Sequence, residues 1–196
     1  MPFNTPVPLD TRLVSDSEAK SKISSKAFGL VPEQGYIYID AGTTTLPLAQ
    51  KIATSMNTGS LTVVTNDVQI AILLAKQQFP HILLGGNIHP VTQSISGVMA
   101  IEQASQFQYN LCVISVDYVS PAGKTGCALL EEAKLKSKII GLSEKSVLLA
   151  ASGKFKSGCG AIIADLKQFN CWITDTVEPQ MRKTAAKADM EIIQAK

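Results

Sequence analysis

The stretch IDAGTTTLPLAQKI, residues 39–52, runs from an apolar, strand-like segment into an amphipathic helical pattern over residues 46–55. Gly42 permits a tight turn between the two. Pro47 suits the first turn of a helix, where the N–H that it lacks would have no partner. A strand, a tight turn and a helix in this order form the building block of a parallel α/β sheet.

Seven apolar runs recur along the chain, and most are continuous rather than alternating, which is typical of strands covered on both faces. They are YIYID (36–40), LTVVTN (61–66), HILLGG (81–86), LCVISVD (111–117), SVLLAA (146–151), CWITD (171–175) and EIIQA (191–195). Helical patterns lie between several of them, and one precedes the first. We therefore expect an α/β fold over residues 11–196, an open and mostly parallel sheet of six or seven strands with helices on both faces. Residues 1–10, punctuated by prolines, are expected to be an unpacked lead-in or a linker remnant.

Composition argues against several classes of protein. The 196 residues carry a formal charge of +2 with dispersed lysines, whereas nucleic-acid binding needs a clustered basic face. The sequence has neither a membrane-length apolar run nor a signal peptide, so we expect a soluble cytoplasmic protein. Four cysteines without a CxxC pair and two histidines argue against a zinc site, and we expect no cofactor. Cys112 and Cys171 are expected to be buried and apolar in character.

Several predicted strands end in polar or glycine residues, and these ends would gather at the edge where open α/β sheets bind ligands. After the first strand, Thr43–Thr45 place hydroxyl and backbone N–H groups at the start of a helix. Free N–H groups and the helix dipole together suit a phosphate. The residues alone leave open the alternative that the threonines only cap the helix.

Other strand ends allow two interpretations each. Lys154, in SVLLAASGKF, is placed to reach a phosphate across the edge, or else is a solvated surface lysine. Asn66 either bonds sugar hydroxyls or caps the helix that follows it. Gly85 and Gly86 either let the backbone approach a ligand or simply turn the chain.

Six segments in order resemble the effector-sensing domain of the DeoR family, bacterial repressors of sugar-metabolism operons. They are IDAGTTT (39–45), VVTND (63–67), ILLGGNIHPVTQSISG (82–97), EEAKLKSKII (131–140), LLAASGKF (148–155) and WITDT (172–176). The resemblance runs from about residue 10 to the end. It implies a Rossmann-like sheet similar to ribose-5-phosphate isomerase and the CoA-transferases, and a phosphorylated sugar as the effector.

The resemblance also implies a set of effector-binding residues, carried over motif by motif. These are Asp40, Gly42, Thr43, Thr44 and Thr45 of a D-x-G-T-T phosphate loop, Asn66 of a V-x-T-N strand end, Gly85 and Gly86 of an L-x-G-G turn, Glu132 and Lys136 of an E-A-x-x-K helix, and Lys154 of a D-S-S-K-F segment. Ala151 and Gly153 depart from that last motif, and residues 115–119 depart from the family's G-x-D-G-I. These departures affect the expected sugar contacts and leave the phosphate loop intact.

The family places a winged helix-turn-helix before this domain, and nothing of that kind precedes Asp10. We therefore expect DNA contact only through a helix-turn-helix domain absent from these residues, and a homo-oligomer, since operator readers commonly work as symmetric dimers. The alternative is an enzyme of the sugar-phosphate isomerase class, which needs a general base. Asp40 and Asp117 are candidates, as is Asp175 on a late strand. Because Asp40 is expected to order the loop by accepting its N–H bonds, we favour a sensor without catalysis.

Overall fold

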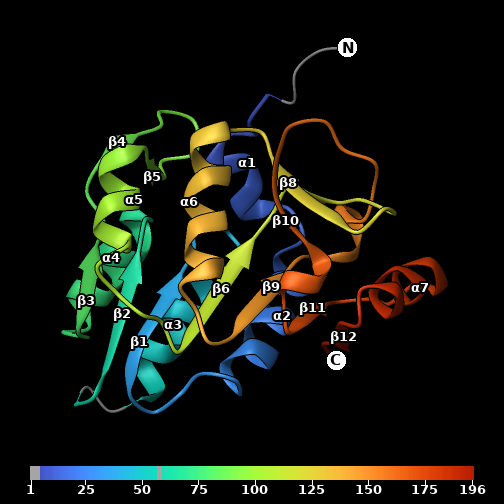
Figure 1. Cartoon of the computed structure of the whole chain (residues 1–196). Helices are drawn as coiled ribbons and strands as arrows, with labels where there is room; N and C mark the ends of the chain where they lie inside the picture. Colours follow the sequence, from blue (N-terminus) through green and yellow to red (C-terminus); the bar gives the residue numbers. More distant parts are fainter. Residues whose placement is uncertain (1–4, 57–58) are drawn as a thin grey trace.

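The computed structural model describes residues 5–56 and 59–196, so the first four residues of the predicted lead-in lie outside the described residues. Its centre is a seven-stranded sheet in the order β12-β11-β9-β6-β1-β2-β3, with parallel pairing throughout (Figure 1). Each of the seven apolar runs contributes one strand, so the predicted fold class is confirmed. The strands are β1 (Gly35–Ile39), β2 (Leu61–Thr65), β3 (His81–Leu83), β6 (Leu111–Ser115), β9 (Ser146–Leu149), β11 (Cys171–Thr174) and β12 (Glu191–Gln194).

The strand order changes direction beside β1. From β1 the chain builds β2 and β3 on one side, then crosses to β6 on the other side and continues outward to β12. Such a switch point leaves a crevice outside the carboxyl ends of the two central strands, where open α/β sheets bind ligands. Asp40 follows β1 and Val116 follows β6, so the loop quoted above lies at this point.

Helices cover both faces of the sheet, and alternate side chains of β1 meet them. Ile37 and Ile39 belong to the cluster that includes side chains of α2 (Ser17–Phe28), α3 (Leu46–Ser55) and α4 (Val68–Lys76). Tyr38 belongs to the opposite cluster, with side chains of α5 (Val98–Ala104), α6 (Leu130–Gly141) and α7 (Pro179–Lys187). Since both faces are buried, the strand runs are apolar throughout.

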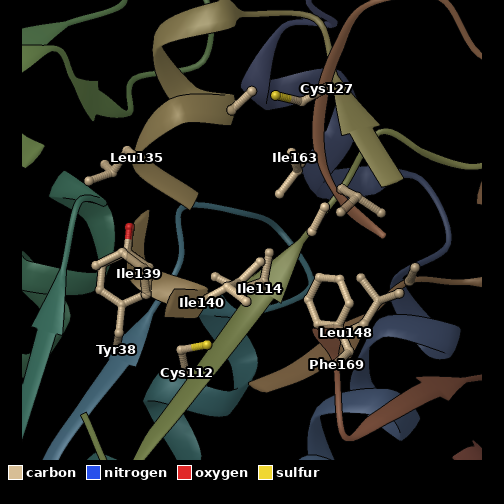
Figure 2. Close-up of a cluster of buried hydrophobic side chains, with 14 of the residues drawn as sticks. Tyr38, Cys112, Ile114, Cys127, Leu135, Ile139, Ile140, Leu148, Ile163 and Phe169 are labelled. Atoms are coloured by element: carbon tan, nitrogen blue, oxygen red, sulfur yellow. The ribbon is translucent and has the colours of Figure 1, made fainter. Parts of the chain in front are cut away.

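Figure 2 shows the α6 side of this core. Ile139 and Ile140 lie over Ile114 and Cys112 of β6, and Tyr38 lies beside them. Cys112 is completely buried and is a free thiol, as is buried Cys171, which confirms that both behave as small apolar side chains.

The shorter strands were not predicted. β7 (Tyr118–Val119), β8 (Lys124–Cys127) and β10 (Ala161–Asp165) form an antiparallel sheet, and β4 (Asn87–Ile88) pairs with β5 (Ile95–Ser96). These strands are too short, and in β4 and β8 too polar, to stand out from turns by composition.

Part of the predicted lead-in packs on the domain, because α1 (Leu9–Val14) buries Leu9. None of the helices in the described ranges is long and apolar enough to cross a membrane.

Candidate effector site at the switch point

The candidate site begins with the turn between β1 and α3. Thr45 Oγ1 lies 2.6 Å from the Asp40 carbonyl oxygen and 2.8 Å from that of Gly42, to which the Thr45 amide also donates. These bonds curl the backbone directly into α3. Among residues 5–56 and 59–196, the amides of Thr43 and Thr44 have no hydrogen-bond partner. Free amides at a helix N-terminus attract anions.

Ser115, at the end of β6, holds this turn against the sheet. Its Oγ and its amide lie 2.7 and 2.9 Å from Asp40 Oδ2 and donate to it. A Cβ on Gly42 would lie only 2.6 Å from Ser115 Oγ, so the close approach requires glycine. The expectation that Asp40 accepts N–H bonds from its own loop is wrong. Asp40 continues the pairing of β1 with β6, which places its carboxylate beside Ser115.

Asp40 and Lys136 form a buried ion pair next to the loop. Lys136 Nζ lies 2.8 Å from Asp40 Oδ2, and the two side chains are 5% and 0% exposed. The same ammonium donates to the Ser115 carbonyl at 2.9 Å. Burial alone would lower the pKa of Lys136, but attraction to the Asp40 carboxylate outweighs it and raises this pKa above its ordinary value. Lys136 is therefore a charged group with its countercharge in contact.

Glu132 lies one turn before Lys136 on α6, so both side chains project from the same face of the helix. Glu132 Oε1 accepts from Thr92 Oγ1 at 3.0 Å and from Ser94 Oγ. These partners belong to the β4–β5 segment, which is thereby fastened to α6. The start of α6 is held by the Ala128 amide, which donates to Asp117 Oδ2 at 2.9 Å.

Lys154 ends the short 3-10 helix η1 (Ser152–Lys154) that follows β9. The Ser152 amide donates to Asp175 Oδ1 at 2.7 Å, which fixes η1 to the end of β11. Burial lowers the pKa of Lys154, and within the described part of the chain its ammonium has no ion pair. Unlike Lys136, this is a half-buried cation without a countercharge in contact.

These elements surround one cavity of about 80 Å³. Its lining comes from six parts of the chain. It includes Pro6, Val7, Arg12, Ser15, Asp16, Lys20, Ala41, Gly42, Thr43, Thr44, Thr92, Ser94, Ser115, Val116, Asp117, Glu132, Lys136, Ala151 and Lys154.

A family model of the DeoR C-terminal sensor domain matches residues 15–176. This chain belongs to the DeoR family. The resemblance seen in the sequence motifs is thus confirmed over most of the chain, and the cavity lies in a sensor domain.

Relatives of this sensor domain include bacterial regulators. An uncharacterized HTH-type transcriptional regulator of Haemophilus influenzae is 33% identical over 174 residues, which are 87% of this chain and 65% of the relative. The HTH-type transcriptional repressor GlcR of Bacillus subtilis is 30% identical over 86% of this chain and 64% of its own length. The glycerol-3-phosphate regulon repressor of Escherichia coli is 26% identical over 88% and 68%. The chain thus spans about two thirds of the length of these relatives.

Solved structures share the fold of the sensor domain at low identity. Ribose 5-phosphate isomerase A of Methanocaldococcus jannaschii has a TM-score of 0.53 and 12% identity over 72% of this chain and 55% of that chain. The eIF2B delta subunit of Chaetomium thermophilum has a TM-score of 0.54 and 10% identity over 74% and 52%. The expected likeness to the ribose-5-phosphate isomerase fold is confirmed.

The structure divides the predicted effector-binding residues of the sensor domain into two groups. Those that line the cavity are Gly42, Thr43, Thr44, Glu132, Lys136 and Lys154. Asp40 and Thr45 lie behind the lining as supports of the loop. Asn66 is also buried behind it, where its Oδ1 accepts from the Ala41 amide and its Nδ2 donates to the Ile95 carbonyl, both at 2.9 Å.

Gly85 and Gly86 lie outside the lining as well. The Gly85 amide donates to Gln103 Oε1 at 2.6 Å. Gly86 has a φ of +144°, and a Cβ there would lie 2.7 Å from the Ser96 carbonyl oxygen. Both glycines thus serve the turn between β3 and β4, and their contact with an effector stays a prediction, as does that of every residue carried over from the family motifs.

Arg12 and Lys20 line the cavity but were not predicted. One signal was present in the sequence. Lys20 occupies the same helical row as Ile23, Ser24 and Ala27, all of them buried, and a lysine in a buried row needs an explanation. Arg12 carried no such signal, because it reaches the cavity through the path of the chain before α2.

Proposed function

We propose that this domain binds a phosphorylated sugar and serves as the effector-binding part of a DeoR-type transcriptional regulator. The observation that carries the proposal is an excess of positive charge around free amides. Arg12, Lys20 and Lys154 line the same cavity as Thr43 and Thr44. Within residues 5–56 and 59–196, none of these three cations has a carboxylate within 4 Å. A phosphate dianion would supply the countercharge and would accept bonds from the amides.

The names of relatives support this class of ligand. The Escherichia coli relative is the glycerol-3-phosphate regulon repressor, and a relative of Staphylococcus epidermidis, 28% identical, is the lactose phosphotransferase system repressor. Regulators of this kind act on DNA in the cell interior, which agrees with the cytoplasmic location expected from the sequence.

Thermal unfolding with matched ligands tests the proposal. Glucose 6-phosphate, fructose 6-phosphate and glycerol 3-phosphate are each compared with their unphosphorylated counterparts, and sodium sulfate at equal ionic strength serves as the control for salt. A ligand at 100 times its Kd adds about 2.7 kcal/mol, which for ~200 residues raises Tm by roughly 5–10 °C. Equal stabilisation by the unphosphorylated compounds would contradict the proposal.

One observation keeps the isomerase alternative open to test. Glu132 and Asp117 both place carboxylates at the cavity, and isomerisation needs such a base. Both are already engaged, Glu132 by Thr92 and Ser94 and Asp117 by the Ala128 amide. We therefore expect no turnover of ribose 5-phosphate by the purified protein, and turnover that Glu132→Gln abolishes would establish the enzyme instead.

A further inference from the structure

The segment before α2 forms one wall of the effector cavity. Pro6, Val7, Arg12, Ser15 and Asp16 all contribute to the lining. The helix in this segment, α1, lies near the N-terminal end of α6, beyond the carboxyl ends of the central strands (Figure 1). The site is therefore covered by residues 5–16, which we call the N-terminal wall.

The cavity behind the N-terminal wall is too small for the ligand class proposed above. Its volume is about 80 Å³, whereas small-molecule sites commonly have roughly 300–1,000 Å³. A phosphate group alone fits such a space, but a sugar attached to it does not. A sugar attached to that phosphate has to extend through the open side of the cavity or displace part of the lining.

Within the described residues, α1 is tied to the rest of the domain by one buried side chain and a few hydrogen bonds. Leu9 is the single buried residue of α1, and its amide donates to the Val91 carbonyl at 3.3 Å. The other tie is Lys20, whose ammonium donates to the carbonyls of Arg12 and Ser15, the latter at 2.5 Å. The remaining lining comes from the strand ends, α6 and the segments fastened to them. Low local stability of this kind marks the segments that move when ligands bind.

Two residues outside the helices, Ser15 and Asp16, join the wall to the domain. Asp16 has φ 52° and ψ 33°, the left-handed conformation, between extended Ser15 and the first turn of α2. Rotation at these two residues would swing α1 without disturbing α2, which buries Lys20, Ile23, Ser24 and Ala27. Hinges of moving segments commonly consist of a few residues at the end of an element.

The charges around the wall favour its release by an anion. The buried Lys20 ammonium donates to the neutral carbonyl oxygens of Arg12 and Ser15. The charges of Arg12 and Lys154 lie close enough to repel it. Arg12 Nε is buried without a partner among the described residues. The nearby acids are Asp16 and Asp117, neither in contact with these cations. A phosphate dianion is a stronger acceptor than a carbonyl group, so it would take the Lys20 ammonium from Arg12 and Ser15. Arg12 attracts the ligand in the closed cavity and leaves with the wall, and Lys20 and Lys154 then remain as the countercharges.

We propose that residues 5–16 form a wall, latched by Leu9 and Lys20 and hinged at Ser15–Asp16, that a phosphorylated sugar displaces when it enters the cavity. The inference rests on the proposed function and adds its regulation. The N-terminal side of the chain changes position according to whether the cavity is occupied. Displacing the latch opposes binding, so the apparent affinity of the protein is lower than that of the open cavity.

Hydrogen exchange followed by mass spectrometry tests the movement on the full chain. The probes are glucose 6-phosphate and glycerol 3-phosphate at saturation, with glucose and glycerol as controls. We expect the amides of Leu9, Arg12 and Ser15, which are hydrogen-bonded to Val91, Pro8 and Thr11, to exchange several-fold faster with the phosphorylated probes. Amides of α2 and α3 should exchange at the same rate or more slowly.

Two variants of α1 test the latch. Leu9→Ala removes its single buried side chain, and Val14→Ala changes a side chain of the same helix that is 79% exposed. We expect Leu9→Ala to bind glucose 6-phosphate several-fold more tightly, because less latch has to be displaced, and Val14→Ala to bind as the parent does. Faster exchange in Leu9→Ala without ligand should be confined to residues 5–16.

The outcomes that contradict the proposed function and those that contradict the movable wall can be told apart. If no phosphorylated compound binds by calorimetry, the proposed function is wrong and the ligand-driven movement falls with it. If a phosphorylated probe binds while the amides of Leu9, Arg12 and Ser15 exchange unchanged or more slowly, the function stands and the movable wall is wrong. Weaker binding by Leu9→Ala would also overturn it, since the wall would then be a lid that closes over the ligand. Faster exchange throughout α2 in that variant would show that the wall has no independent motion.

Discussion

Two lysines of the cavity differ in one respect, which decides what each can do. Lys136 has the Asp40 carboxylate at 2.8 Å, whereas Lys154 has no carboxylate within 4 Å among the described residues. A cation that is already paired has little to offer a ligand, and an unpaired one has its full charge available. At the residue scale, we therefore propose that Lys154 binds the ligand and that Lys136 serves the structure.

Lys154→Ala should weaken binding of a phosphorylated sugar with little effect on folding. A hydrogen bond to a charged group contributes about 1.5–3 kcal/mol, so Kd should rise roughly 10- to 100-fold. Calorimetry measures the change. Lys156→Ala is the matched control, because Lys156 is exposed, lies two residues further along and is not part of the cavity lining. Equal losses in the two variants would mean that general positive charge, rather than a contact, attracts the ligand.

Lys136→Met should destabilise the fold by about 3–5 kcal/mol, because it leaves the Asp40 carboxylate buried without its partner. Urea unfolding measures the loss, and adding Asp40→Asn should recover much of it. Burial raises the pKa of Asp40 in the folded state, and without Lys136 the rise should be greater. In Lys136→Met, the protonated Asp40 carboxyl therefore contributes to the free energy of unfolding in full below its unfolded pKa of about 3.9. That contribution is lost as the pH rises through the pKa of Asp40 in the folded state. A single variant whose stability does not improve on acidification, relative to the parent protein, would contradict this account.

Elements whose signal lies in neighbouring residues of the sequence were predictable. The sheet could be predicted because each strand buried on both faces is a continuous apolar run. The turn of residues 40–45 could be predicted because its glycine and threonines act on adjacent backbone. The antiparallel strands β7, β8 and β10 were missed because two to five residues carry no period. Residues 5–10 of the N-terminal wall were expected to be part of an unpacked lead-in, because the packing of Leu9 depends on Val91, which is distant in sequence.

The shape of the turn before α3 requires a residue without a Cβ at position 42. Gly42→Ala would place a Cβ 2.6 Å from Ser115 Oγ, the hydroxyl that bonds to Asp40. We expect a loss of roughly 1–3 kcal/mol from overpacking, and weaker binding of phosphorylated sugars, since the amides of Thr43 and Thr44 follow directly. Gly141→Ala is the control. It lies at the end of α6 with no heavy atom within 4 Å of the new Cβ, so its stability should be unchanged or slightly higher. Unfolding midpoints and calorimetry on both variants decide the matter.

At the scale of the whole molecule, we expect the described residues to hold DNA only weakly by themselves. The chain has 18 basic and 16 acidic residues, and the three cations discussed above face a cavity rather than an outer surface. Non-specific DNA binding requires several basic groups arranged along phosphates. We propose that any effect of the ligand on DNA is relayed from the cavity, and the proposed movement of the N-terminal wall is one route by which occupancy would reach a part of the chain outside the pocket.

Self-association is the other property that belongs to the whole molecule. Ile88, Val98 and Met99 are 59%, 67% and 60% exposed and lie in and just after the β4–β5 hairpin, which follows the edge strand β3. Exposed apolar groups that are close in the chain favour association, and operator-binding regulators are commonly symmetric dimers. We expect sedimentation velocity at micromolar concentration to show a dimer or tetramer, and Val98→Lys combined with Met99→Lys to shift it toward the monomer. Ile162→Lys on β10 changes a side chain of similar exposure, 61%, in the separate antiparallel sheet, and it should leave the assembly intact. A parent protein that sediments as a monomer at every concentration would refute the expectation, whereas an effect of Ile162→Lys alone would move the interface to the β10 side of the molecule.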